Sequence, residues 1–140
     1  EVRKEAMLTL AHLDEPDVIP ALITSLLEDT SWEVRRNAAQ ALDRKSNPSS
    51  ADALALSISD DHWQVRKFSL RALNAHVLEN HISNILPLLC DDYSDVRKEA
   101  ALALGGISTD QSRAALKRSI NDSDIEVRIA SEKSLARISN

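Results

Sequence analysis

Glycine, proline and aromatic residues are scarce in this sequence of 140 residues, which has two Gly, four Pro, two Trp, one Tyr and one Phe. Mixed and all-β domains place glycine in their turns and fill their sheets with aromatic side chains, so this composition excludes both classes. The composition therefore predicts an all-α protein.

Cysteine is also scarce, and because Cys90 is the only one, no intramolecular disulfide can form. A chain of this length can fold around one core without a metal or a disulfide. No apolar run approaches the roughly 20 residues of a membrane span, and no signal sequence is visible, so we expect a cytoplasmic protein. The net charge of −5 argues against nucleic acid as the main partner.

A repeat with a period of 31 or 32 residues runs through the chain. All Val-Arg dipeptides share its register and begin at Val2, Val34, Val65, Val96 and Val127. A leucine follows each valine by eight residues, at Leu10, Leu42, Leu73, Leu104 and Leu135. An aspartate precedes the last four valines by five residues, at Asp29, Asp60, Asp91 and Asp122. Three columns in one register indicate a single structural unit that is repeated.

Each unit predicts two helices. From the valine onward, apolar residues recur at helical spacing and predict a first helix, A, as in Val96, Ala100, Ala103, Leu104 and Ile107. Helix A is expected to start with a capping box or a close relative, formed by the pairs Thr30/Glu33, Asp61/Gln64, Asp92/Asp95 and Ser123/Glu126. A second apolar stretch predicts helix B, with its first example at Ile19, Leu22, Ile23, Leu26 and Leu27.

The core pattern D-x-x-x-x-V-R-x-x-A/S-x-x-x-L occurs at 29–42, 60–73, 91–104 and 122–135. This pattern resembles the HEAT-repeat family, and specifically the short HEAT-like repeats of phycobilisome lyases. The resemblance implies an all-α, right-handed α-solenoid of about 4.5 repeats and nine antiparallel helices, with the B helices on its concave face. The family's usual Leu-Gly-apolar ending of helix A is kept only at 104–107.

The chain is expected to form one domain, 1–140, with repeats at 1–29, 30–60, 61–91, 92–122 and 123–140. Solenoids need polar terminal repeats to seal the stack, and neither end resembles one. We therefore expect the chain to be a piece of a longer array.

The arginine column and the aspartate column are the most regular charged feature. One interpretation is a basic track for an anionic polymer. We favour the other, in which each arginine bonds an aspartate at a neighbouring helix start and holds successive units in register. The predicted ladder consists of Asp29, Arg35, Asp60, Arg66, Asp91, Arg97, Asp122 and Arg128.

No catalytic constellation is visible, and we expect neither a catalytic residue nor a cofactor nor a metal. The family includes deoxyhypusine hydroxylase, whose iron ligands are His-Glu pairs just after the arginine; no histidine occupies those positions here. A metal site from His62, His76, His81 and Cys90 fits no usual ligand spacing, so we expect these side chains to be scattered.

Two groups of residues are candidates for partner binding. Trp32, Trp63 and Tyr93 lie in successive B-to-A turns and either grip a partner or fold over the preceding B helix, which we favour. The second group is predicted on the concave face, where Leu56, Leu86 and Pro87 would form an apolar groove beside the basic Lys117 and Arg118. If the register were off by one residue, these leucines would instead be core. Pro87 should also kink its helix.

These features favour a non-catalytic scaffold that presents a concave groove to a protein or peptide. The alternative, from the type of repeat, is a phycobilin-lyase-like protein that acts on a tetrapyrrole-bearing antenna subunit. Nucleic-acid binding has only Arg113, Lys117 and Arg118 in its favour, and the net charge opposes it.

Overall fold

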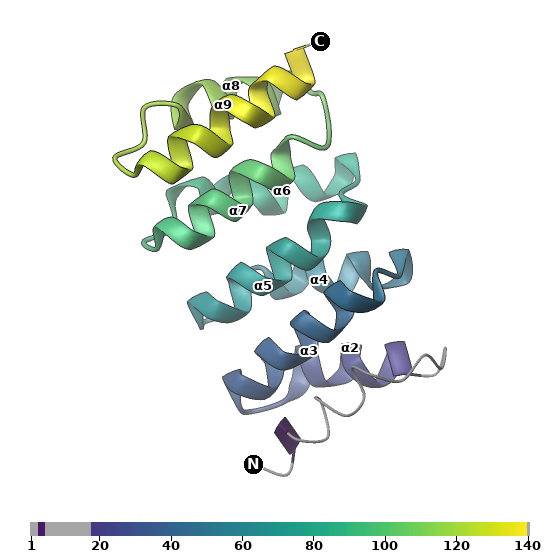
Figure 1. Ribbon diagram of the computed structural model, residues 1–140. Coiled ribbons are helices and arrows are strands. Elements are labelled where there is room, and N and C mark those ends of the chain that lie inside the picture. The colour runs from purple at the N-terminus through teal and green to yellow at the C-terminus, as the bar shows by residue number, and fades with distance from the viewer. Residues whose placement is uncertain (1–2, 5–17, 140) are drawn as a thin grey trace. The chain divides into compact units, whose positions relative to one another are not determined.

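The computed structural model describes residues 3–4 and 18–139 of the chain (Figure 1). Within these residues the protein is all-helical, as predicted, with eight α-helices and four short 3-10 helices. The α-helices are α2 (Val18–Glu28), α3 (Trp32–Lys45), α4 (Ala51–Ser57), α5 (Trp63–Leu73), α6 (Ile82–Ile85), α7 (Ser94–Leu104), α8 (Asp110–Ser119) and α9 (Ile125–Ser139). The 3-10 helices are η1 (Pro48–Ser50), η2 (Asn74–His76), η3 (Glu79–His81) and η4 (Leu86–Cys90). The first of the nine predicted helices lies outside the described residues.

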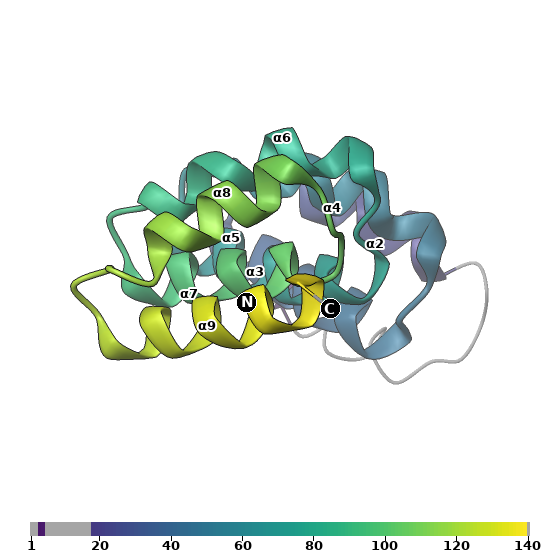
Figure 2. The ribbon, with the colours of Figure 1, turned by 90° about the horizontal axis from the view of Figure 1, so that it is seen from above.

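The chain divides into two compact units, Glu1–His76 (unit 1) and Val77–Asn140 (unit 2). The division falls inside the third predicted repeat, after its A helix. In unit 1 the A helices α3 and α5 pack on each other, and the B helices α2 and α4 form a second layer. Unit 2 repeats this arrangement, with α7 and α9 in one layer and α6, η4 and α8 in the other (Figure 2).

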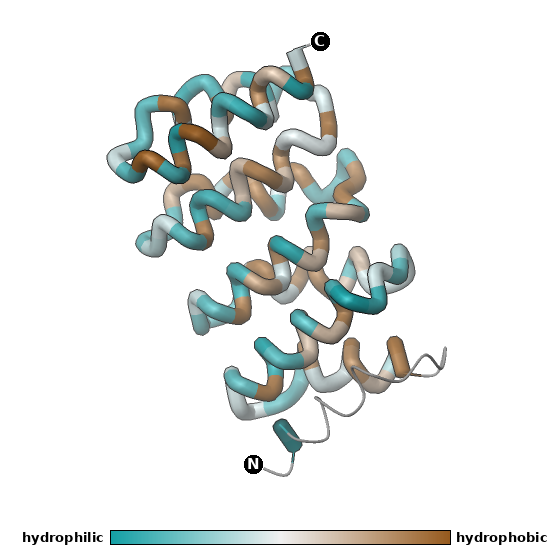
Figure 3. Tube along the Cα trace, in the orientation of Figure 1, coloured by the Kyte–Doolittle hydropathy of each residue, from teal (hydrophilic) through white to brown (hydrophobic). Residues whose placement is uncertain are grey.

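Apolar residues form one stripe along each A helix, and this stripe is the core. The valine column is buried from Val34 to Val127, with at most 1% of any of these side chains exposed. The leucine column is buried at Leu42, Leu73 and Leu104. Hydropathy alternates along the helices accordingly, with apolar and polar residues following each other at helical spacing (Figure 3).

Helix A starts one residue later than the capping boxes predicted. The N-caps are Ser31, His62 and Tyr93 rather than Thr30, Asp61 and Asp92. In α9 the side chain of Asp124, not Ser123, accepts hydrogen bonds from the backbone N–H groups of the first turn. The predicted caps were wrong because the aspartate column turns the chain first, as described below.

The B segments differ from the prediction in two ways. Leu27, which belongs to the apolar stretch of the first predicted B helix, is 42% exposed, whereas Ala55 on α4 is buried, because the short B helices are apolar on several sides. Pro87 does more than kink its helix. The α-helix α6 ends after one turn, and Pro87 stands in the first turn of η4, where its missing N–H costs no hydrogen bond.

The A helices of the two units end by different devices. Helix α3 ends at Ser46, the only described non-glycine residue with a positive φ, at 47°. Helix α7 ends at Gly105, whose φ of −72° any residue could adopt. Glycine is needed there for space, because an added Cβ would lie 2.6 Å from Ser134 Oγ and 3.1 Å from its Cα.

Candidate protein-binding site

The aspartate column shapes the turns between helices B and A. In each turn an Oδ1 atom accepts a hydrogen bond from the backbone N–H two residues later. The acceptor–donor pairs are Asp29 with Ser31 (2.8 Å), Asp60 with His62 (2.9 Å), Asp91 with Tyr93 (3.0 Å) and Asp122 with Asp124 (2.9 Å). These are Asx turns, which set the direction in which the chain enters helix A. Sequence reasoning missed them, although the constant spacing from aspartate to valine was a visible signal.

The arginine column bonds the same turns. Each arginine donates from Nη1 to the carbonyl oxygen of the aspartate six residues earlier, at 2.8 to 2.9 Å. The residues involved are Arg35, Arg66, Arg97 and Arg128. In unit 1, Arg35 also donates from Nε and Nη2 to both carboxylate oxygens of Asp60, at 2.7 and 3.0 Å. In unit 2, Arg97 forms the same bidentate pair with Asp122, at 2.9 and 3.2 Å.

The electrostatics of these pairs favour the charged forms. The hydrogen bonds to Asp60 raise the pKa of Arg35 despite its partial burial, and those to Asp122 do the same for the pKa of Arg97. Burial by itself would raise the pKa of Asp122, but hydrogen bonds from Arg97 and from the backbone of Asp124 hold it below its usual value. The two side chains of each of these arginine–aspartate pairs therefore neutralise each other.

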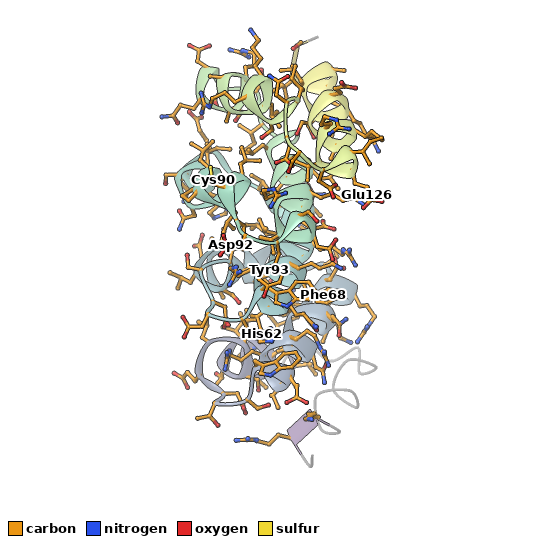
Figure 4. The ribbon with its side chains drawn as sticks, turned by 90° about the vertical axis from the view of Figure 1, so that its left-hand side faces the viewer. His62, Phe68, Cys90, Asp92, Tyr93 and Glu126 are labelled. Carbon is orange, nitrogen blue, oxygen red and sulfur yellow. The ribbon has the colours of Figure 1, made fainter. Side chains whose placement is uncertain are left out.

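The aromatic edge in unit 1 is a packed cluster. The rings of Trp32 and His62 lie parallel, with centroids 3.7 Å apart and an angle of 3° between their planes. The guanidinium of Arg36 covers the Trp32 ring at 5.1 Å, and it donates a hydrogen bond to Gln64 at 2.9 Å. His62 also caps α5, because its Nδ1 accepts from the backbone N–H of Gln64 (Figure 4). Sequence reasoning treated His62 as a scattered surface histidine and missed both roles.

The corresponding positions of unit 2 carry Tyr93 and Ile125. Tyr93 is 47% exposed, and Ile125, which follows the cap Asp124, is 60% exposed. Trp63 lies near His62, with ring centroids 6.4 Å apart, so it belongs to the cluster of unit 1. The predicted aromatic edge is thus a ring stack in one unit and an exposed side chain in the other. Its role in partner binding stays a prediction.

A groove of about 570 Å³ lies on the B side of unit 2, between η4 and α8. Its apolar lining includes Leu86, Leu89 and Ala114, and its charged lining consists of Arg118 and Asp122. Cys90 stands at its edge, on the B side of the unit, whereas Glu126 lies on the side of α9 (Figure 4). We call this feature the unit 2 groove. Leu89 was not among the predicted groove residues, so the structure adds it to the candidate site.

The other predicted groove residues are placed as follows. Pro87 and Lys117 are exposed but do not line the unit 2 groove. Leu56 belongs to unit 1, where it is 64% exposed on α4, and Leu27 of α2 is exposed on the same B layer. The B layer of each unit therefore offers apolar side chains to solvent.

The remaining candidate chemistry is not gathered in one place. His76 bonds the Ser46 hydroxyl at 3.3 Å, and buried His81 accepts at Nδ1 from the backbone N–H of Leu78. Across the described ranges, no three His, Cys, Asp or Glu side chains are grouped so that they could hold a metal ion. No described helix has the length and hydropathy needed to cross a bilayer.

Repeated helix pairs, layered A and B helices and a bonded turn in every repeat define a protein of the α-solenoid class. A family model for HEAT repeats matches residues 1–74 and again 53–136. The chain therefore belongs to the HEAT-repeat family. A search of curated protein sequences gave no significant match.

Solved structures support the same fold. The complex of CpcE and CpcF of phycocyanin lyase from Nostoc sp. PCC7120 contains a chain that matches with a TM-score of 0.83 and 19% identity, over 98% of this chain and 59% of that one. An engineered protein matches at 0.72 and 26% identity, over 97% and 72%. A designed armadillo repeat protein in complex with the peptide (KR)4 matches at 0.74 and 19% identity, over 96% and 74%. The chain thus spans little more than half of the lyase subunit that it resembles.

Proposed function

We propose that this chain is a non-catalytic interaction module that binds a segment of another protein in the unit 2 groove. The observation that carries the proposal is the groove itself, in which Leu86 and Leu89 line a space of about 570 Å³ that is open to solvent. Repeat proteins commonly bind their partners on such a B face. The Arg97–Asp122 pair joins α7 to the turn before α9 in the same unit.

The size of the effect follows from the apolar surface. Neither Leu86 nor Leu89 is fully buried, so a partner that covers them removes apolar area from water. At about 25 cal/mol per Å², covering the exposed part of one of these half-buried leucines contributes on the order of 0.5 to 1.5 kcal/mol. Two leucines then account for a change in affinity of roughly 5-fold to 150-fold.

The test is a selection from random peptides, which works without a natural partner in hand. A phage-displayed library of random 16-residue peptides is selected on the immobilised chain, and the enriched peptides are titrated against variants by fluorescence anisotropy. We expect Leu86→Asn/Leu89→Asn to weaken their binding at least tenfold. Asparagine is used because aspartate could pair with Arg118.

Leu78→Asn is the matched control, because Leu78 also lies in unit 2, is 56% exposed and does not line the groove. Circular dichroism checks that every variant is folded. Peptides that bind the double variant as tightly as the wild type would show that the groove is not the binding site. A library with no enriched peptide would likewise contradict the proposal.

A phycobilin-lyase-like role is the second candidate, and the likeness to the phycocyanin lyase structure is the observation that favours it. At 19% identity this likeness concerns the fold alone. Titration with phycocyanobilin separates the two roles, because a bilin held in the groove would change its absorption spectrum and compete with the selected peptides. We expect no spectral change.

A further inference from the structure

We infer that the segment bound in the unit 2 groove is acidic, with one or more carboxylates beside its apolar side chains. The inference rests on the proposed function and adds the charge of the partner. It follows from three observations about the groove. Asp122 is already paired with Arg97, Arg118 has no paired carboxylate among the described residues, and a basic partner would meet the like charge of Arg118.

The negative charge of the groove is already matched. Asp122 is the only acid that lines it, and both carboxylate oxygens accept hydrogen bonds from Arg97, at 2.9 and 3.2 Å. Its Oδ1 also accepts from the backbone N–H of Asp124. A basic side chain of a partner would have to displace Arg97 from this pair. Asp122 is therefore part of the ladder and not a free binding group.

The positive charge of the groove is not matched. Arg118 is exposed in the last turn of α8 and lines the groove, and within the described part of the chain no carboxylate pairs with it. Arg113 of the same helix differs, because it forms an ion pair with Asp110. The segments α6, η4 and α8 contain no acid other than Asp110, so Arg118 has no counter-charge among them.

A guanidinium beside an apolar surface is well suited to a carboxylate. Arg118 can donate two parallel hydrogen bonds to one carboxylate, and covering Leu86 and Leu89 would exclude water from around that pair. A lysine or arginine of the partner would instead place like charge next to Arg118. Gln111 and Asn121, the amides of the lining, can bond either sign and do not alter this preference.

The experiment uses the same selection and measures the effect of charge. We expect the peptides enriched on the wild-type chain to carry Asp or Glu together with apolar residues. We expect Arg118→Glu to weaken their binding about tenfold or more, since one charge-assisted contact is replaced by repulsion. Changing the peptide's acids to amides should weaken binding to the wild type and strengthen binding to Arg118→Glu, because the repulsion between like charges is removed. A peptide with Lys at those positions should restore binding to Arg118→Glu.

Lys117→Glu is the matched control, because Lys117 lies in the same last turn and is also exposed, but it does not line the groove. Its effect on binding should be much smaller than that of Arg118→Glu, although both substitutions change the charge of the chain and of the helix end equally.

The outcomes separate the inference from the proposed function. Enriched peptides that are neutral or basic but still need Leu86 and Leu89 would overturn the acidic partner and leave the groove as the binding site. Acidic peptides that need the leucines but bind equally to the wild type and to Arg118→Glu would do the same. Acidic peptides that ignore both the leucines and Arg118 would overturn the two proposals together.

Discussion

The two units hold their repeats together in the same way but begin and end their helices differently. Arg35 with Asp60 in unit 1 and Arg97 with Asp122 in unit 2 form the same kind of bidentate pair. Unit 1, however, caps α5 with a stacked histidine and ends α3 at a left-handed serine, whereas unit 2 ends α7 at a glycine that touches α9. The two units thus share the arginine–aspartate pairs and differ at their helix ends.

The B layers differ in charge. The only charged residues of α2 and α4 in unit 1 are the acids Glu28 and Asp52, whereas α8 of unit 2 ends in Lys117 and Arg118. Both layers also expose apolar side chains, so the same architecture presents apolar surface with acidic groups in one unit and with basic groups in the other. The charges of the B layer thus differ between the units, whereas the arginine–aspartate pairs of the A helices do not.

The largest expected effect on stability lies at Gly105, at the end of α7 in unit 2. Gly105→Ala should lower the free energy of unfolding by about 2 kcal/mol, because the new methyl group overlaps the Ser134 side chain and approaches its backbone. Urea unfolding followed by circular dichroism measures the change.

Gly106→Ala is the matched control, since the nearest atom to its added Cβ is 3.4 Å away. We expect this variant to be as stable as the wild type or up to about 0.5 kcal/mol more stable. Equal stability of the two alanine variants would show that Gly105 is not required for close packing.

A smaller difference between the units should appear with pH. Burial lowers the pKa of His62 below its usual value of 6.5, while Asp60 favours its charged form and nearby arginines oppose it. As the pH falls, the unfolded chain therefore binds this proton first. The stabilisation is complete above pH 6.5 and is lost as the pH falls through the folded pKa, when Nδ1 can no longer accept from Gln64. Both tryptophans lie in unit 1, so their fluorescence during urea unfolding reports this change.

His62→Asn should flatten this pH dependence, because asparagine can cap the helix without titrating. The variant should also lose about 1 kcal/mol at neutral pH through the missing stack on Trp32. His76→Asn is the control and should keep the wild-type slope. An unchanged slope in His62→Asn would assign the pH dependence to another group.

Because of Asp122, unit 2 should lose stability at a lower pH than unit 1. Its folded pKa is held below the usual aspartate value, so its contribution is complete above about pH 4 and is lost only as the pH falls further. We therefore expect acid to destabilise unit 1 at a higher pH than unit 2.

The smallest expected effect lies at the end of α3. Ser46→Gly should stabilise the chain by about 0.5 to 1 kcal/mol, because glycine adopts a φ of 47° without the steric cost that a side chain brings. Ser59→Gly, also at an exposed position after a helix in unit 1 but without a positive φ, should give no gain. Thermal unfolding measures both, and equal melting temperatures for the two variants would contradict the strain at Ser46.

The sequence by itself determined the repeat and the helix pairs, and it predicted the Arg35–Asp60 and Arg97–Asp122 pairs. These features follow from spacing along one chain, since a valine, an arginine and an aspartate at constant intervals must occupy the same positions in every turn of a regular structure. The valine column is buried as the helical period predicts, and the family follows from the same columns.

Only the tertiary structure decided the rest. The caps moved by one residue because the Asx turn fixes the residue two positions after the aspartate at the helix entry, and Leu89 lines the groove because η4 winds more tightly than an α-helix after Pro87. Gly105 matters through Ser134, and His62 through Trp32, each about 30 residues away. Such contacts depend on which faces of two helices meet, and short helices that are apolar on several sides leave that choice to the packing.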